Sequence, residues 1–441
     1  LDMMWYGRTF LFDGSPVIED VWIDGYGGSL DGAKESDGSE WRRVLVVQQG
    51  KGGPVTLALD VTDPSDPIYL WEVTNDTDVT AMGYTVSTPV IGNIYNAEST
   101  TPSDYHDTWT AMWGGGRGVP YKSSSSTNYY NSAEGNIYFH HIGDDYWGTH
   151  TTQYSDAGSN DQIDSSQTDS DSDGYYEYSY ISGALAAVDA DSDGDIDVLY
   201  FPVTTSYEPT DMSDPDGDGS SGLTDLADPG YTWMYKAIID AADPDDPTWC
   251  EFYDPLDTVG VRPEVYYAAT TSWHVDGSLG VYWGTGTPYD RDSTDVGYFF
   301  AVKDETPLSC NGYTAITDCG TGGAYTLNAG EGLTGNPIIY AGTVYFTTYE
   351  PASDRCTEGT GRIYGLAFDD CDGNVDTDGD GIGDSAAIEV DGYPSSIAVG
   401  KHGVYYGTSD RSGTGVTTVG ELNSVADPFM DTNTMGFREV F

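Results

Sequence analysis

A three-part strand unit recurs along the chain and limits its possible folds more than any other feature. Each unit opens with an apolar strand led by a small residue or Pro, continues with a strand that usually ends in Gly or Thr, and closes with an aromatic-rich strand. Six such units follow one another, spaced roughly 60 to 95 residues apart. A repeat of this length predicts a series of similar antiparallel sheets.

The first strands of the six units are expected at Ser15–Ile23, Ser87–Tyr95, Ser182–Ala190, Arg262–Thr270, Gly335–Thr343 and Pro394–His402. The second strands are expected at Val44–Gly50, Trp109–Gly116, Val198–Val203, Val281–Gly286, Val344–Glu350 and Val404–Asp410. The third strands are expected at Thr56–Val61, Asn136–Ile142, Trp233–Ile239, Tyr298–Asp304, Ile363–Asp369 and Met435–Phe441. Fourth strands such as Ile68–Val73 would complete some units.

Sequential antiparallel strands in repeated units indicate the blades of a β-propeller. The 35 Tyr and 11 Trp residues, many of them next to Val, Ile or Thr, favour strands, and the 56 Gly residues mark turns. A β-sandwich is the alternative, but it does not predict a recurring unit. We therefore predict an all-β fold, a β-propeller with six clear blades, forming one domain over residues 1–441. Inserted acidic loops are expected over 146–178 and 204–230, and Tyr121–Asn131 also has the composition of a surface loop.

The third unit contains a loop of nine residues that carries five aspartates, Asp189, Asp191, Asp193, Asp195 and Asp197. Positions 1, 3, 5 and 9 of the loop offer side-chain oxygens, position 7 offers the carbonyl of Asp195, and Gly194 takes the sharp turn at position 6. This spacing is that of a shortened EF-hand loop, placed between two strands instead of two helices. Hard oxygen ligands in this number suit Ca²⁺ better than Mg²⁺ or a transition metal, and the other interpretation is a solvated acidic turn.

Three further loops follow the same spacing and are predicted to bind Ca²⁺, although each could also be a flexible acidic loop. Their ligands would be Asp169, Asp171, Asp173 and Glu177 in the first, Asp214, Asp216, Asp218 and Asp225 in the second, and Asp376, Asp378, Asp380 and Asp384 in the third.

The chain is strongly acidic, with 73 Asp and Glu residues against 16 Lys and Arg residues and a formal net charge of −57. Nucleic acids and anionic membrane surfaces are therefore poor partners. A solubilising surface or a saline habitat explains most of such an excess, and the clustered aspartates suggest that part of it serves cations. No run of eighteen apolar residues is present, so no membrane span is expected.

Five cysteines occur without a CxxC or zinc-type spacing. Two local disulfides, Cys310 with Cys319 and Cys356 with Cys371, are expected, which leaves Cys250 over. Disulfides and calcium loops of modest affinity agree with a secreted, extracellular protein. The chain opens at Leu1 without a signal peptide, which suggests that upstream sequence was removed or not included.

No catalytic constellation stands out. The six histidines are scattered, and His140 and His141 lie in a strand-like run with one face toward the core and the other toward solvent. GxSxG, HExxH and Walker A motifs are absent, and the glycine-rich run Gly114–Gly118 lacks a following helix, which favours a tight turn over a phosphate cradle. We predict a protein that is not an enzyme.

Several segments of the chain carry recognisable motifs, namely Trp41–Val73 with its ALDVTDP motif, Met82–Ile94, Ala186–Tyr200, Leu279–Gly286, Val344–Cys356 and the closing GFREVF. Together they resemble the PilY/PilC family of type IV pilus tip-associated proteins. These matches fall in order over nearly the whole chain. The insertion over 146–177 and the excess of acid go beyond the usual pattern of the family.

The resemblance implies a C-terminal propeller domain, a modified seven-bladed ring in which Ser15–Ile23 would pair with C-terminal strands. It also implies a pilus biogenesis factor and adhesin at the pilus tip or cell surface, with minor pilins or the tip complex and an unknown surface or host ligand as partners. A variable N-terminal domain is normal in that family. The family's calcium loop, which governs pilus extension and retraction, falls on Asp189, Asp191, Asp193, Asp195 through its carbonyl, and Asp197.

Two other functions remain possible from the sequence. A quinoprotein-like propeller enzyme would also combine calcium with tryptophans, but such enzymes need adjacent cysteines, and this chain has no Cys-Cys pair. The second is a subunit of an extracellular filament or surface layer whose acidic surface is bridged by calcium. A bound quinone would identify the first function, and assemblies that depend on calcium would identify the second.

Overall fold

The computed structural model describes residues 12, 14–26, 37–74, 82–83, 87–95, 107–116, 121–122, 129–130, 136–143, 152–155, 179–181, 183–205, 231–240, 243–261, 263–286, 296–316, 318–352, 357, 359–377, 382–400, 403–409 and 417–422. The chain divides into two compact units, one of residues 1–251 with Phe441 and one of residues 252–440. Each unit is described by itself. We number the large sheets one to six in chain order.

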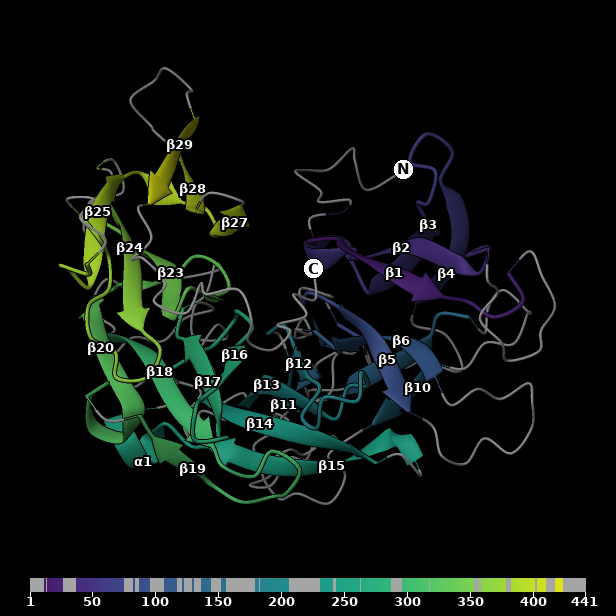
Figure 1. Cartoon of the computed structure of the whole chain (residues 1–441), viewed down its shortest axis with the longest axis horizontal. Helices are drawn as coiled ribbons and strands as arrows, with labels where there is room; N and C mark the ends of the chain where they lie inside the picture. The colour runs from purple at the N-terminus through teal and green to yellow at the C-terminus, as the bar shows by residue number, and fades with distance from the viewer. Residues whose placement is uncertain are drawn as a thin grey trace. The chain divides into compact units, whose positions relative to one another are not determined.

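The first unit holds sheets 1 to 3. Sheet 1 has the order β1-β2-β3-β4, with β1 (Val17–Trp22), β2 (Trp41–Gln48), β3 (Val55–Asp60) and β4 (Ile68–Thr74). Sheet 2 has the order β10-β9-β6-β5, with β5 (Val90–Tyr95), β6 (Asp107–Gly114), β9 (Ile137–His141) and β10 (Thr152–Ser155). Sheet 3 has the order β11-β13-β14-β15, and β12 also pairs with β13, with β11 (Ser179–Tyr180), β12 (Ala186–Val188), β13 (Val198–Thr205), β14 (Tyr231–Asp240) and β15 (Asp243–Tyr253). Strands β13, β14 and β15 lie side by side in Figure 1.

The second unit holds sheets 4 to 6. Sheet 4 consists of β16 (Thr270–Trp273), β17 (Leu279–Gly284), β18 (Val296–Asp304), β19 (Tyr313–Ala315) and β20 (Ala324–Ala329). Sheet 5 consists of β21 (Gly332–Leu333), β22 (Ile338–Tyr340), β23 (Thr343–Glu350), β24 (Thr360–Ala367) and β25 (Ala387–Asp391). Sheet 6 consists of β26 (Tyr393–Pro394), β27 (Ala398–Gly400), β28 (Gly403–Ser409) and β29 (Thr417–Leu422).

Little other regular structure is present in the described residues. A two-stranded ribbon joins β7 (Tyr121–Lys122) to β8 (Tyr129–Tyr130). Helical segments are α1 (Leu256–Val259), η2 (Gly50–Gly52) and η5 (Thr321–Gly323). None of the helices in this part of the chain is long and apolar enough to cross a bilayer. The all-β prediction is confirmed.

The six sheets match the six sequence units, with two differences. The first strand of sheet 4 is β16, so the strand predicted at Arg262–Thr270 is placed too early. The turn at Gly277, whose φ is +85°, pairs Trp273 with Leu279 and thereby sets the register. In sheet 6, β29 pairs with β28, whereas the predicted third strand at Met435–Phe441 lies outside the described residues.

Two segments predicted as loops contain short strands. β10 lies within 146–178 and pairs with β9, and β7 and β8 lie within Tyr121–Asn131. Thr152, Tyr154 and the tyrosines of β7 and β8 have high strand propensity, which a prediction from low apolar content overlooks. In the insertion at 204–230, only residues 204 and 205, which end β13, are described.

The burial of the strands explains why they form. β3 alternates between half-buried and buried residues, as expected for a strand with one face on the core. β17, in contrast, is buried at every position, and so are the first six residues of β23. Strands without a solvent face occur where a sheet is covered on both sides.

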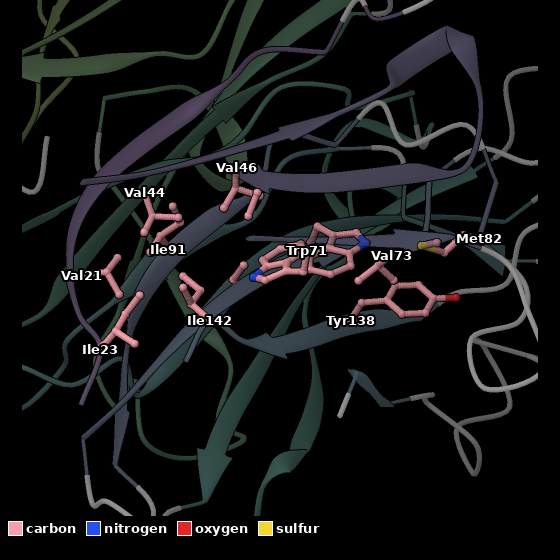
Figure 2. Packing of buried hydrophobic residues seen from close by; sticks show 13 residues of the cluster. Val21, Ile23, Val44, Val46, Trp71, Val73, Met82, Ile91, Tyr138 and Ile142 are labelled. Carbon is pink, nitrogen blue, oxygen red and sulfur yellow. The ribbon is translucent and has the colours of Figure 1, made fainter. Parts of the chain in front are cut away.

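Aliphatic and aromatic side chains together fill the core between sheets 1 and 2, where Trp71 and Tyr138 lie among valines and isoleucines (Figure 2). The Trp71 ring lies 6.4 Å from that of Trp113 and 4.1 Å from that of His140, and Trp113 stacks on Tyr138 at 5.9 Å. His140 is fully buried, while His141 is half-buried and its Nδ1 lies 2.9 Å from Thr110 Oγ1. Both faces of β9 are therefore largely covered, since Ile137 and Phe139, on the same face as His141, are buried, and the predicted solvent face is wrong.

The expected disulfide pairing is wrong, although disulfides are present. Cys319 bonds to Cys371, with a Cα–Cα distance of 5.0 Å, and Cys250 and Cys310 are also disulfide-bonded. Cys319 and Cys371 belong to one apolar cluster that draws on sheets 4 and 5. Proximity across two neighbouring sheets, and not along the chain, decides the pairing. Cys356 lies outside the described residues.

Candidate metal centre

The acidic loop Asp189–Asp197 connects β12 to β13, in the hairpin that the sequence predicts. Ala186, Ala187 and Val188 pair with Tyr200, Leu199 and Val198. The backbone N–H of Asp197 closes the loop by donating to the carbonyl of Val188 at 2.9 Å, and the carbonyl of Asp197 accepts from Ile239 of β14 at 2.8 Å. The last acidic residue of the loop is therefore fixed in sheet 3.

Three of the five predicted ligands come together in this loop. One carboxylate oxygen from each of Asp189, Asp191 and Asp197 lies within 4.8 Å of the others. Asp189 and Asp197 are half-buried and Asp191 is exposed. Three anionic groups at this separation repel one another unless a cation lies between them, and their hard oxygens are the ligands that Ca²⁺ prefers. The donor set fits a calcium ion.

The backbone of the loop curls around these carboxylates. Asp189 accepts hydrogen bonds from the amides of Ser192 at 2.6 Å and Gly194 at 3.0 Å. Asp191 accepts from the amide of Asp193 at 3.2 Å. Gly194 has a φ of +104°, which residues with a side chain rarely adopt, so the predicted turn at position 6 requires glycine.

Asp193 and Asp195 stand apart from the three-carboxylate cluster. The Asp193 carboxylate accepts from the backbone amide of Asp195 at 3.0 Å. The Asp195 carboxylate accepts from the side-chain amide of Asn93, a residue of β5 in sheet 2. Such an Asp195 would serve an ion through its carbonyl, the role that the sequence predicts.

The surroundings of the Asp197 carboxyl group shift its pKa. Burial raises its pKa above the ordinary value of 3.8, and the charges of Asp191 and Asp193 raise it further. The backbone amides of Ala190 and Asp191 donate to Asp197 Oδ2 at 2.6 and 3.3 Å and act in the opposite direction. A nearby positive charge would favour the ionised form.

The other predicted calcium loops are described only in part. Asp169, Asp171, Asp173, Glu177, Asp214, Asp216, Asp218, Asp225, Asp378 and Asp380 lie outside the described residues. Asp376 is buried, and Asp384 accepts from the amide and hydroxyl of Thr377 at 3.0 and 2.8 Å. Within the part of the chain that the structure describes, the loop at 189–197 is the one place where three potential ligands gather.

Sequence reasoning missed two residues that support this loop, Asn93 and Gly92. Asn93 is separated from Asp195 by 102 residues, and no pattern along the chain links the two. Their contact depends on the packing of sheet 2 against sheet 3, in which Ile94 and Met112 meet Leu199 and Phe201.

A second charged group, around Arg362 in sheet 5, was also missed. Its guanidinium contacts Glu350 at 2.7 Å, Glu389 at 3.2 Å and Glu331 at 3.4 Å. Glu331 also accepts hydrogen bonds from the Thr348 hydroxyl and, at 3.0 Å, from the amide of Asn328. The Arg362 guanidinium neutralises the buried Glu331 carboxylate, so we interpret this charged group as structural.

The comparisons agree with the resemblance seen in the sequence, although no protein-family model matches the chain. Over 111 residues, a quarter of this chain, it is 30% identical to the type IV pilus biogenesis factor PilY1 of Pseudomonas aeruginosa. Over the same length it is 32% identical to a PilY1 homologue of Xylella fastidiosa. Each match spans only 7% of the relative. The predicted similarity to the PilY/PilC family is confirmed.

The crystal structure of the PilY1 C-terminal domain of Pseudomonas aeruginosa is similar over most of its length. It superposes with a TM-score of 0.54 at 17% identity, covering 93% of this chain and 85% of that domain. This likeness shows the fold and confirms the predicted β-propeller class. The number of blades stays a prediction.

Proposed function

We propose that this chain is the calcium-binding propeller domain of a type IV pilus biogenesis factor, acting without enzymatic activity. The single observation that supports the pilus assignment most is the similarity to PilY1 in both sequence and fold. The three converging carboxylates of Asp189, Asp191 and Asp197 support the calcium assignment.

The loop residues would act as follows. Asp189, Asp191 and Asp197 would hold the ion with their carboxylates, Asp193 would turn toward it, and Asp195 would offer its carbonyl. A bound Ca²⁺ supplies positive charge that offsets the repulsion among these groups. Because the folded loop presents the ligands together and the unfolded chain does not, calcium binding would stabilise the folded loop.

The site would make the domain sensitive to the calcium concentration outside the cell. A rigid loop at the end of β12 and β13 would present a fixed surface to minor pilins or the pilus tip complex, and loss of the ion would loosen it. We propose that this change regulates pilus extension, retraction and surface attachment. The location would be the pilus tip or the cell surface.

Calcium titration followed by melting temperature tests the site. We expect calcium to raise the Tm of the wild-type chain and to leave an Asp191→Ala/Asp193→Ala variant nearly unchanged. Asp63→Ala/Asp66→Ala is the matched control, because it removes two aspartates from the exposed turn between β3 and β4. Equal responses of the wild type and the loop variant would refute the site.

Binding to minor pilins tests the role. The chain, with and without calcium, is passed over immobilised minor pilins of a type IV pilus. We expect binding that the Asp191→Ala/Asp193→Ala variant weakens. A chain that binds calcium but no pilin in either state would contradict the pilus role while leaving the ion site intact.

A further inference from the structure

Asn93 connects the acidic loop of sheet 3 to sheet 2. It lies in β5, and its side-chain amide donates a hydrogen bond to the Asp195 carboxylate. Its backbone carbonyl accepts a second bond, from the amide of Ile196, at 2.8 Å. One residue of the neighbouring sheet thus holds two consecutive residues of the loop.

Gly92 lets the two sheets approach closely enough for these bonds. A Cβ atom at this position would lie 1.9 Å from Cδ1 and 2.9 Å from Cγ1 of Ile196. The Ile196 side chain occupies that space and packs against the apolar cluster between sheets 2 and 3. Strand β5 therefore holds residues 195 and 196 both by hydrogen bonds from and to Asn93 and by packing of the Ile196 side chain on Gly92.

The carboxylates of Asp189, Asp191 and Asp193 differ in this respect. They accept hydrogen bonds from amides of the loop itself, at 2.6 to 3.2 Å. The first half of the loop, Asp189 to Asp193, is thus held by hydrogen bonds within the loop, whereas residues 195 and 196 are held by sheet 2. The Asp195 carboxylate accepts the hydrogen bond from Asn93 and is not one of the three carboxylates that gather at Asp189, Asp191 and Asp197.

The chemistry of the side chain at position 93 suits this task. A neutral amide donates a hydrogen bond to a carboxylate without adding a charge that would compete with a cation. It also supplies a hydrogen-bond donor to one carboxylate of a crowded acidic loop. A hydrogen bond to a charged group stabilises a structure more than one between neutral groups.

We propose that Asn93 is a positioning residue for the calcium loop, which couples ion binding to the packing of sheet 2 against sheet 3. By holding the Asp195 side chain it leaves the Asp195 carbonyl for the ion, and by holding Ile196 it passes the ordering of the loop to β5. This inference depends on the calcium site proposed above.

Calcium affinity, measured by calorimetry on the folded chain at fixed ionic strength, gives the first test. We expect Asn93→Ala to weaken calcium binding about tenfold, as the loss of one hydrogen bond to a charged group implies. Asn311→Ala is the matched control, because its side-chain amide also donates hydrogen bonds within a turn, to Thr306 and Ser309 at 3.1 and 2.9 Å. The control should bind calcium like the wild type.

Variants of Asp195 test the same hydrogen bond from its other end, and they cover the case in which Asn93→Ala folds poorly. Where both single variants fold, they complete a double-mutant cycle. Asp195→Asn keeps the backbone carbonyl and an acceptor for Asn93, so its affinity should stay within about threefold of the wild type. Asp195→Ala removes the same hydrogen bond as Asn93→Ala, so the double variant should bind no more weakly than the weaker single variant.

Hydrogen exchange of β5 gives a readout that an effect on stability alone would not produce. Calcium should slow exchange of β5 amides in the wild type and should slow it less in Asn93→Ala, which loses the side-chain bond to Asp195 but keeps the backbone bond to Ile196. If the wild type binds calcium while Asn93→Ala matches it in affinity and in β5 protection, the positioning role is refuted and the site stands. If the wild type binds no calcium, both proposals fall.

Discussion

The Asp197 carboxyl group is partly buried beside other carboxylates, so its ionisation makes the stability of the fold depend on pH. Its pKa is higher in the folded chain than in the unfolded chain, because burial and then Asp191 and Asp193 disfavour the ionised form. The folded state therefore holds this proton more tightly. Its contribution to the free energy of unfolding falls as the pH rises from 3.8 through the raised pKa, and then stays constant.

Asp197→Asn removes that penalty. In calcium-free protein, we expect the Tm of the variant relative to the wild type to increase with pH over this window and to level off above it. Thermal melts from about pH 2 to 7 measure the difference and also cover the control, whose change falls below pH 3.8. Asp63→Asn is the control of opposite sign, because the Ser65 side chain and amide lower the pKa of Asp63. A difference for Asp197→Asn that does not change with pH would contradict the role of its ionisation.

Gly194 allows a second prediction about a single residue. We expect Gly194→Ala to lower the free energy of unfolding by about 1–3 kcal/mol, because a side chain is strained at a φ of +104°. No atom lies within 4 Å of the added Cβ, so backbone strain is the only cost. Urea denaturation measures it, with Gly312→Ala as the control, since that turn position is equally open and has no positive φ.

The site shows which residues a sequence can reveal. Asp189 to Asp197 are close along the chain, so their spacing alone predicts a hairpin loop and its turn at Gly194. Asn93 contacts the loop because sheets 2 and 3 pack against each other. The sequence of a strand that contains an Asn does not indicate such a contact.

The same distinction between local sequence and long-range contacts applies to the strands. The sequence Val55–Asp60 predicts the strand β3 and its place after β2. It does not predict which face is buried, because Thr56 and Asp60 are buried while the leucines between them are half-buried. The start of β16 was misplaced because the apolar run before it resembles a strand, whereas the turn at Gly277 decides the register. The disulfide between Cys319 and Cys371 depends on which sheets become neighbours, and local spacing predicted other pairs.

Arg362 links β24 to the strands on either side, β23 and β25, and also to Glu331. We expect Arg362→Ala to lower the free energy of unfolding by about 3–5 kcal/mol, because Glu331, whose side chain is fully buried, would lose its counter-charge. Chemical denaturation measures this loss. Arg43→Ala should change stability little, since Arg43 and its partner Asp20 are both exposed. Similar losses in the two variants would contradict a special role for burial at Arg362.

At the scale of the whole molecule, the net charge of −57 predicts general repulsion that salt relieves. We expect the Tm to rise as sodium chloride increases from 0.05 to 1 M, in the wild type and in Asp191→Ala/Asp193→Ala alike. Calcium should act at far lower concentration and on the wild type alone. A calcium effect that equal ionic strength of magnesium or sodium reproduces would point to screening instead of a site.

The disulfide between Cys319 and Cys371 also requires that folding of the segment between them precedes oxidation. The two sulfur atoms belong to residues 52 positions apart, and they meet only in the cluster shared by sheets 4 and 5. During synthesis or export, the thiol of Cys319 emerges first and has to wait for β23 and β24 before its partner arrives. An oxidant that acts too early would favour a bond to the wrong cysteine, so correct maturation calls for slow oxidation or a disulfide isomerase.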